Sequence, residues 1–271
     1  MTNHYYMTPL TKIDNLYFKR EDLNPTGSTK DRALPFQIQN LIKNNFSTAV
    51  ISSTGNAAIS ASYYCQQANI PLTIFVSPKI SQSKLPLIKG HVIQSLQAIS
   101  DAIKFSKANH AYLLRQSTDP SAQIGYSQVA TELLEQLPQI TSLFIPVGSG
   151  TTLLGIAKKL PLTIKIFAVQ PASNPTICSA FTSEYTLETE TITDALSVKY
   201  LPLKNEVIRA IKKHQGSGLI ISNQETIDCL DFTNQFSLSA ESALTIAAFQ
   251  QMKNNPEVGD YPVILLTGTK R

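Results

Sequence analysis

The chain has 271 residues, of which 42% are apolar and 15% are charged, and its net charge is +4. This length suffices for one large domain or two smaller ones with substantial cores, and no apolar run is long enough to cross a membrane. The weak positive charge is dispersed along the chain, so we expect no nucleic-acid partner, although such a charge suits an anionic small molecule. Residues 1–4 lack a basic segment followed by an apolar one, so no secretory signal is predicted and a cytoplasmic location is expected.

The predicted strands and helices alternate along the chain. Strands are predicted from short runs rich in β-branched and aromatic residues, at 16–20, 48–52, 71–76, 91–94, 111–115, 142–147, 164–170, 218–222 and 262–267. Helices are predicted from apolar residues spaced three and four apart, from 28 or 29 to 42, and at 56–67, around 81–89, 99–108, 123–137, 152–160, 204–214, 223–236 and 240–253. This alternation predicts an α/β fold built of βαβ units, with mostly parallel sheets covered by helices.

A lysine follows the first predicted strand, where the chain turns into a helix. The segment N-P-T-G-S-T-K-D-R at 24–32 places turn residues before Lys30, and Ser28 and Thr29 are good N-cap residues. We therefore expect Lys30 in the first helical turn, where the helix dipole favours a bound anion such as a phosphate. A desolvated amine at such a place suits a Schiff base with an aldehyde cofactor, whereas a solvated lysine after a turn is the commoner case.

A second strand-to-helix junction carries hydroxyl and amide groups. The segment I-S-S-T-G-N-A-A at 51–58 offers backbone N–H groups and the hydroxyls of Ser53 and Thr54 to a carboxylate. Asn56 has a side-chain amide that suits a phenolic oxygen. The alternative for this segment is an ordinary N-cap with a tight turn.

A third junction is rich in glycine. In I-P-V-G-S-G-T-T-L-L-G at 145–155, glycines allow the backbone to approach a phosphate, while Ser149, Thr151 and Thr152 add hydroxyl donors. The spacing fits neither a dinucleotide fingerprint nor a Gly-Lys-Ser/Thr phosphate loop. A monophosphate site is therefore predicted at this junction.

In combination, the three segments resemble the fold-type II pyridoxal phosphate-dependent enzymes, the superfamily of tryptophan synthase beta and cysteine synthase, and within it the threonine synthases. The resemblance runs from about Pro9 to the C-terminus and includes the order of the segments. It implies two parallel-sheet αβα domains with pyridoxal 5′-phosphate in the cleft between them. The larger, cofactor-anchoring domain would comprise 1–46 and 133–271, and the smaller, inserted substrate-loop domain would comprise 47–132. The resemblance also implies a homodimer.

The resemblance implies a role for each matching residue. Lys30 would be the catalytic residue that forms the Schiff base and moves the Cα proton of the substrate. Thr267 would face the pyridine nitrogen, where a hydroxyl does not enforce protonation and so favours elimination or replacement over transamination. The residues that would hold the cofactor are Lys30, Asn56, Gly148, Ser149, Gly150, Thr151, Thr152 and Thr267. The residues that would bind the substrate are Ser53, Thr54, Gly55 and Asn56.

Two departures from the threonine synthase pattern leave the substrate open. Ala122 and Ser127 stand where the family places basic residues that grip the substrate phosphate, so O-phosphohomoserine is only one candidate. Arg115 lies just upstream as a substitute. The lysine also comes by residue 30, so much of the family's N-terminal region is absent, and we expect a more open cleft or one closed by a partner subunit.

We therefore predict a pyridoxal phosphate-dependent elimination or replacement on a small amino acid, of the threonine synthase type. A serine/threonine ammonia-lyase and a cysteine synthase-like β-replacement are alternatives within the same class. From a different class, a non-catalytic paralogue could bind the cofactor and regulate a partner. Retention of Lys30 and of all three loops argues against it, because a pure binder does not need the proton-transfer amine.

The cysteines and histidines give no metal-ligand spacing. Cys65, Cys178 and Cys229 are too far apart for a zinc motif, and we expect reduced thiols. We expect surface or packing roles for His4, His91, His110 and His214. No metal site is predicted.

Overall fold

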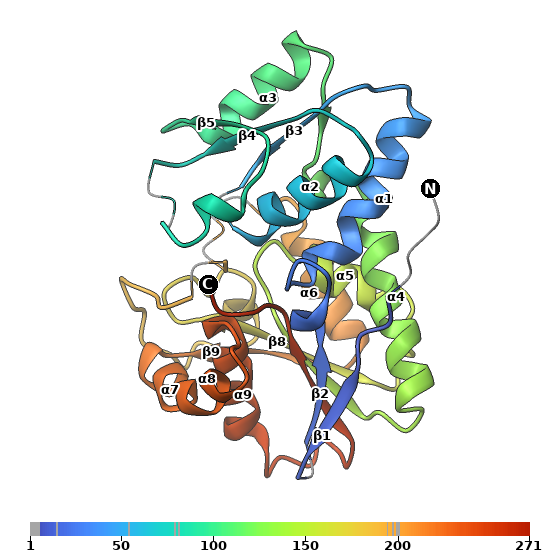
Figure 1. Ribbon diagram of the computed structural model, residues 1–271. Helices are drawn as coiled ribbons and strands as arrows, with labels where there is room; N and C mark the ends of the chain where they lie inside the picture. Colours follow the sequence, from blue (N-terminus) through green and yellow to red (C-terminus); the bar gives the residue numbers. More distant parts are fainter. Residues whose placement is uncertain are drawn as a thin grey trace.

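Two sheets built mainly of parallel strands form the protein, the smaller above the larger in Figure 1. This computed structural model describes residues 6–14, 16–53, 55–78, 80, 82–193, 195–196, 198 and 201–271. The predicted α/β fold with parallel sheets is confirmed.

The larger sheet has six strands in the order β1-β2-β10-β7-β8-β9. Its strands are β1 (Leu10–Ile13), β2 (Leu16–Arg20), β10 (Pro262–Leu266), β7 (Ser142–Pro146), β8 (Lys165–Pro171) and β9 (Ser217–Ile221). Only the β1–β2 pair is antiparallel. The central strands β7, β8 and β10 are buried along almost their whole length, as expected of parallel strands covered on both faces.

The smaller sheet has four parallel strands in the order β5-β4-β3-β6. These strands are β3 (Ala49–Ser52), β4 (Leu72–Val76), β5 (His91–Gln94) and β6 (Tyr112–Leu113). Apolar clusters cover both of its faces, so each sheet has its own core.

Nine α-helices are found within the described ranges: α1 (Lys30–Lys43), α2 (Asn56–Gln67), α3 (Ala98–Ala108), α4 (Pro120–Gln136), α5 (Thr151–Ala157), α6 (Lys204–Lys213), α7 (Asn223–Asp228), α8 (Leu230–Gln235) and α9 (Ala240–Met252). Short 3-10 helices lie at Glu21–Leu23, Leu85–Leu87, Gln116–Thr118 and Cys178–Ala180. Among the described residues, none of these helices has both the length and the apolarity needed to cross a membrane.

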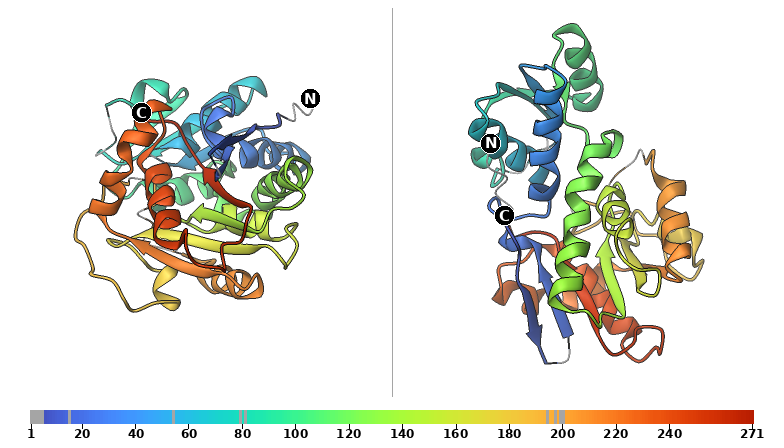
Figure 2. Two further views of the ribbon diagram at one scale, coloured as in Figure 1. Left: turned by 90° about the horizontal axis from the view of Figure 1, so that it is seen from below. Right: turned by 90° about the vertical axis from the view of Figure 1, so that its right-hand side faces the viewer.

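Helices α1 and α4 connect the two sheets. Figure 2, right, shows them side by side, with α1 beside the smaller sheet and α4 extending along the larger one. A glycine makes this close approach possible, since a Cβ added at Gly125 of α4 would lie 1.9 Å from the carbonyl oxygen of Arg32 in α1. Gly155 of α5 likewise lets α5 pack against α4, since a Cβ added there would lie 2.4 Å from the Cβ of Tyr126. The apolar face of α1 joins the core of the smaller sheet. The domain boundaries proposed from the sequence, at 47 and 132, stay a prediction.

Four charged side chains form a buried ion cluster at the base of α1: Lys19, Glu21, Arg32 and Glu132. Arg32 donates to Glu21 at 2.7 Å and to Glu132 at 2.6 Å, and Lys19 is paired with Glu132. Burial raises the pKa of Glu21, but the Arg32 guanidinium outweighs this effect and leaves the pKa below its ordinary value of 4.5. The cluster therefore connects β2, the start of α1 and α4. Its member Arg32 lies only two residues after Lys30 in the sequence.

Two predicted helices differ in the structure, and one strand is additional to the predicted ones. The helix expected around 81–89 is reduced to the 3-10 helix Leu85–Leu87, because Pro86 lacks the N–H that a longer helix needs; residue 81 lies outside the described residues. The helix expected at 223–236 is interrupted at Cys229, whose N–H bonds to the carbonyl of Thr226 in a 3-10 pattern and so separates α7 from α8. Strand β1 was not predicted, because its four residues at the sheet edge show no clear alternation.

Candidate active site

Two of the three junctions singled out in the sequence, together with Thr267, follow strands at one edge of the larger sheet, whereas the second junction follows β3 of the smaller sheet. Strands β2, β10 and β7 are parallel neighbours, so their carboxyl ends are adjacent. The chain reaches Lys30 after β2, Thr267 after β10 and Gly148 after β7. In parallel α/β sheets this edge is where ligands bind.

Lys30 begins α1, in the first helical turn as predicted. Before it, Gly27 has a φ of +72°, and its N–H donates to the carbonyl of Asn24 at 2.8 Å, which closes the turn. The carboxylate of Asp31 accepts hydrogen bonds from the N–H of Thr26 at 2.6 Å and from the hydroxyl of Ser60 at 2.5 Å. Burial raises the pKa of Asp31 in spite of these bonds. The turn and the first turn of α1 are thereby fixed to α2.

Thr29, one of the two residues expected at the N-cap, does occupy that position, but its side chain does not cap the helix. Thr29 precedes the helix with helical φ and ψ, so its side chain makes no cap hydrogen bond. The hydroxyls of Ser28 and Thr29 are buried without a partner among the described residues. The backbone instead holds the start of α1 against the end of β10, because the N–H of Thr29 donates to the carbonyl of Thr267 at 3.0 Å.

The Lys30 amine faces a tyrosine instead of an acid. Its Nζ lies 3.5 Å from the hydroxyl oxygen of Tyr126 and 5.7 Å from the centroid of that ring. The Tyr126 hydroxyl donates to Oε1 of Gln116 at 2.8 Å. In the part of the chain that the structure describes, Lys30 has no carboxylate partner. The amine is half-buried, is not engaged by an ion pair and is available to a ligand.

The second loop joins β3 to α2. The hydroxyl of Ser53 accepts a hydrogen bond from the N–H of Gly55 at 3.2 Å. A Cβ added at Gly55 would meet no atom within 4 Å, so the space beside this residue is open. Thr54, also predicted to bind the substrate, lies outside the described residues.

Asn56 is held by Arg271, which is not among the residues predicted for the site. Nη1 of Arg271 donates to Oδ1 of Asn56 at 3.1 Å, and Nη2 of the same residue donates to the carbonyl of Thr26. Asn56 also lies against Gly268, since a Cβ added there would be 3.0 Å from Nδ2 of Asn56. The second loop therefore meets the lysine loop and the residues after β10 at one place.

The third loop has the geometry of an anion cradle. Gly150 has a φ of +84°, and a Cβ added there would lie 2.3 Å from Cγ2 of Val207, so only glycine fits. The hydroxyl oxygens of Ser149 and Thr151 are 3.0 Å apart. A Cβ at Gly148 would approach the carbonyl oxygen of Ala195 at 3.1 Å. Thr152 is the second residue of α5, half-buried at the start of the helix.

Glu241, in the first turn of α9, supports this loop. Its buried carboxylate accepts a hydrogen bond from the N–H of Ala195 at 3.0 Å, which fixes the segment packed over Gly148. Its distance of 46 residues from Ala195 in sequence explains why no local pattern reveals the contact.

The residues at this edge fit pyridoxal phosphate. The amine of Lys30 is without an acid partner in the described part of the chain, and the glycine and hydroxyl groups of the third loop match a phosphate. Buried hydroxyls lacking a partner among described residues cluster near the lysine loop and near Gly268, at Ser28, Thr29 and Ser239. Such orphaned groups are explained by a polar ligand that completes their hydrogen bonds.

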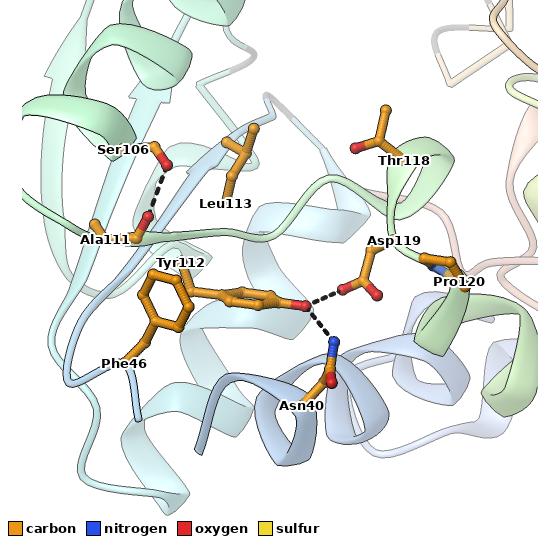
Figure 3. A pocket seen from close by; sticks show the side chains of 9 residues that line it. All are labelled: Asn40, Phe46, Ser106, Ala111, Tyr112, Leu113, Thr118, Asp119 and Pro120. Atoms are coloured by element: carbon orange, nitrogen blue, oxygen red, sulfur yellow. Dashed lines mark hydrogen bonds between the residues drawn. The ribbon is translucent and has the colours of Figure 1, made fainter. Parts of the chain in front are cut away.

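A separate pocket of about 330 Å³ lies beside the smaller sheet (Figure 3). The hydroxyl of Tyr112 donates to Asp119 at 2.7 Å and accepts from Asn40 at 2.8 Å. Burial, followed by the bond to Asp119, raises the pKa of Tyr112 to about 12. The side chains of Asn40, Tyr112 and Asp119 in this pocket already have hydrogen-bond partners, and none of the predicted site residues lines it.

No group of three or more His, Cys, Asp or Glu side chains within the described residues is arranged to hold a metal ion. Cys65, Cys178 and Cys229 are free thiols, as expected, and the first two are buried. Burial raises the pKa of Cys65 to about 12, so this thiol is an inert core residue.

Sequence and structure comparisons bear on what this site does. The family described as "Pyridoxal-phosphate dependent enzyme" matches residues 1–268. L-threo-3-hydroxyaspartate ammonia-lyase of Saccharomyces cerevisiae is 28% identical over 80% of this chain and 70% of that protein. L-threonine ammonia-lyase of Thermotoga maritima is 23% identical over 97% of this chain and 69% of that protein. Threonine synthase of Methanosarcina acetivorans is 24% identical over 96% of this chain and 73% of that protein.

The fold is also that of known structures. A pyridoxal 5′-phosphate-dependent aspartate racemase superposes with a TM-score of 0.87 at 20% identity, covering 100% of this chain and 92% of that one. Serine racemase from Dictyostelium discoideum superposes with a TM-score of 0.84 at 23% identity, covering 98% of this chain and 93% of that one.

Proposed function

Because the chain belongs to the pyridoxal-phosphate dependent enzyme family and so uses pyridoxal 5′-phosphate, we propose that it deaminates a small β-hydroxy amino acid. The net products of this ammonia-lyase reaction are ammonia and a 2-oxo acid. The observation that carries the proposal is the Lys30 amine, which lies at the carboxyl edge of the sheet with the Tyr126 hydroxyl 3.5 Å away. Ammonia-lyases from yeast and from Thermotoga among the relatives support the same reaction class.

In this proposal Lys30 is the catalytic residue. When bound, pyridoxal phosphate withdraws electrons from the Cα atom of an attached amino acid. The Lys30 amine would hold the aldehyde group of the cofactor and would move the Cα proton. The Tyr126 hydroxyl, fixed by its bond to Gln116, would keep Nζ oriented for this role.

The remaining predicted residues have binding roles in the proposal. Gly148, Ser149, Gly150, Thr151 and Thr152 would hold the phosphate. Asn56 would hold the ring oxygen, and Thr267 would face the ring nitrogen. Ser53, Thr54, Gly55 and Asn56 would hold the substrate carboxylate.

The lack of basic residues in α4 favours a hydroxyl leaving group over a phosphate. Ala122 and Ser127 are both buried, and the hydroxyl of Ser127 donates to the carbonyl of Ile124 at 2.7 Å. A phosphate dianion placed there would lose its hydration without gaining a cation.

Threonine synthesis from O-phosphohomoserine is the second candidate. The threonine synthase of Methanosarcina acetivorans matches 96% of this chain, and the lysine turn and the phosphate loop resemble that enzyme class. A cytoplasmic location, a homodimer and the division into 1–46 with 133–271 and 47–132 stay predictions from the sequence.

Product analysis tests the proposal. Purified protein with pyridoxal phosphate is incubated with serine, threonine, 3-hydroxyaspartate or O-phosphohomoserine, and ammonia, 2-oxo acids, phosphate and threonine are measured. We expect ammonia and a 2-oxo acid in equal amounts from one of the hydroxy amino acids, and none from the Lys30→Ala variant. Lys43→Ala, at the exposed end of the same helix, is the matched control and should keep full activity.

The other outcomes separate the alternatives. Phosphate and threonine from O-phosphohomoserine would favour the threonine synthase reaction. Protein that binds the cofactor on Lys30 but turns over none of these substrates would favour the regulatory alternative.

A further inference from the structure

The segment after β10 is fixed beside the lysine loop by backbone contacts. Gly268 forms an antiparallel bridge with Ser28, and the N–H of Thr269 donates to the carbonyl of Gly27 at 3.0 Å. On the other side, the N–H of Lys270 donates to the carbonyl of Ser237 at 2.8 Å. The position of the next residue, Arg271, therefore follows from the fold.

The contact between Arg271 and Asn56 fixes the orientation of the Asn56 amide. A guanidinium has only donors, so the Asn56 atom 3.1 Å from Nη1 has to be the acceptor Oδ1. The Nδ2 group then points the other way, toward Gly268, where an added Cβ would lie 3.0 Å from it. Within the described residues, Nδ2 donates no hydrogen bond to another residue. Both of its N–H groups are therefore available to a ligand at the edge where Lys30 lies.

The nearby acid Asp31 acts on the charge of Arg271 without forming an ion pair with it. The side chain is half-buried, and this burial lowers its pKa even though Asp31 acts in the opposite direction. The carboxylate of Asp31 is taken by Thr26 and Ser60, and Arg271 has no ion-pair partner in the described parts of the chain. The guanidinium therefore donates to two uncharged acceptors, Oδ1 of Asn56 and the carbonyl of Thr26.

We propose that Arg271 is a positioning residue that holds the Asn56 amide with its N–H groups toward the ring oxygen of pyridoxal phosphate. This inference rests on the proposed function, because Asn56 contacts the cofactor only there. Without Arg271 the amide is free to rotate by half a turn, and Oδ1 then faces the anionic ring oxygen. The binding of the cofactor is weakened by the loss of one oriented hydrogen bond, roughly five- to tenfold in dissociation constant.

A double-mutant cycle tests whether Arg271 acts through Asn56. The dissociation constant of pyridoxal 5′-phosphate is measured by absorbance titration of the apoprotein for the unsubstituted protein, Arg271→Met, Asn56→Ala and the double variant. We expect Arg271→Met to weaken binding roughly five- to tenfold when Asn56 is present and by less than about twofold in the Asn56→Ala background. Lys270→Met, the neighbouring exposed residue whose Nζ contacts Asn234 at 2.9 Å, is the matched control and should bind with unchanged affinity.

Each other outcome overturns the inference. Equal weakening of cofactor binding in both backgrounds would mean that Arg271 acts through its contact with the Thr26 carbonyl. No weakening would mean that the contact between Arg271 and Asn56 contributes nothing to cofactor binding. Borohydride trapping on Lys30 in the Arg271→Met variant verifies that the lysine loop is intact, so that a general loss of folding is recognised. If the unsubstituted protein binds no pyridoxal phosphate, the proposed function fails together with this inference, whereas additive effects with normal binding reject this inference alone.

Discussion

Glu132 gives the sharpest test of the buried ion cluster that supports the lysine helix. Its carboxylate is fully buried and accepts hydrogen bonds from Lys19, from both terminal nitrogens of Arg32 at 2.6 and 2.9 Å, and from the N–H of Thr8 at 3.2 Å. The cluster holds two cations and two anions, so it is neutral as a whole. The Glu132→Gln substitution keeps the size and shape of the side chain but removes its negative charge, so one buried positive charge is left uncompensated.

The expected loss is large for a single isosteric change. Removing one partner of a buried charge pair costs about 3–5 kcal/mol in the free energy of unfolding, and the new amide also directs N–H groups at donors. The measurement is equilibrium unfolding in urea at neutral pH, followed by far-UV circular dichroism at a fixed cofactor concentration.

A matched control removes the same charge from an exposed ion pair, so that the effect of burial can be distinguished from the effect of the lost charge itself. Glu206 and Arg209 form an exposed pair on α6 at 3.6 Å, and their side chains are 49% and 72% exposed. Glu206→Gln should lower the free energy of unfolding by less than about 0.5 kcal/mol. If Glu132→Gln costs no more than this control, the cluster is not desolvated and the reasoning is refuted.

Three further predictions concern the site and the helix caps. Gly150→Ala places a Cβ 2.3 Å from Cγ2 of Val207 at a φ of +84°, so pyridoxal phosphate retained after dialysis should fall about tenfold or more; unchanged retention would put the phosphate elsewhere. Tyr126→Phe keeps the ring beside Lys30 but removes the hydroxyl 3.5 Å from Nζ, so kcat should fall about tenfold with little change in KM, and an unchanged kcat would exclude a role for this hydroxyl. Partial burial raises the pKa of Glu225, but its capping hydrogen bonds outweigh burial and leave the pKa below 4.5, so its stabilisation is present above pH 4.5 and is lost as the pH falls through the lowered value. Glu225→Gln should therefore reduce the free energy of unfolding by about 0.5–1 kcal/mol at neutral pH and by less in acid, and equal losses at both would contradict this assignment.

The elements that carry local signals were predictable from the sequence. The helix at 56–67 and the strand at 91–94 are found with the predicted bounds, because each lies between clear turn residues and shows a regular apolar pattern. The position of Lys30 in the first turn of α1 follows from the turn residues before it. The capping box of Ser222 and Glu225 at the start of α7 likewise rests on a local pattern, a serine followed three residues later by a glutamate.

The partners of the site residues were not predictable in the same way. Tyr126 is 96 residues from Lys30 in sequence, and Arg271 is 215 residues from Asn56. Periodicity and turn chemistry describe neighbours within a few residues, so such pairs become visible only when the sheet order is known. Tyr126 and its hydrogen-bond acceptor Gln116 lie on two different elements, so no local pattern reveals this contact either.

Covalent trapping of the cofactor tests the central claim most directly. The protein is incubated with pyridoxal 5′-phosphate, reduced with borohydride and digested, and the modified peptide is identified by mass spectrometry. We predict one phosphopyridoxyl group on Lys30, absent from Lys30→Ala and present in Lys43→Ala. Labelling of a different lysine, or labelling spread over many exposed lysines with none enriched at position 30, would contradict the account.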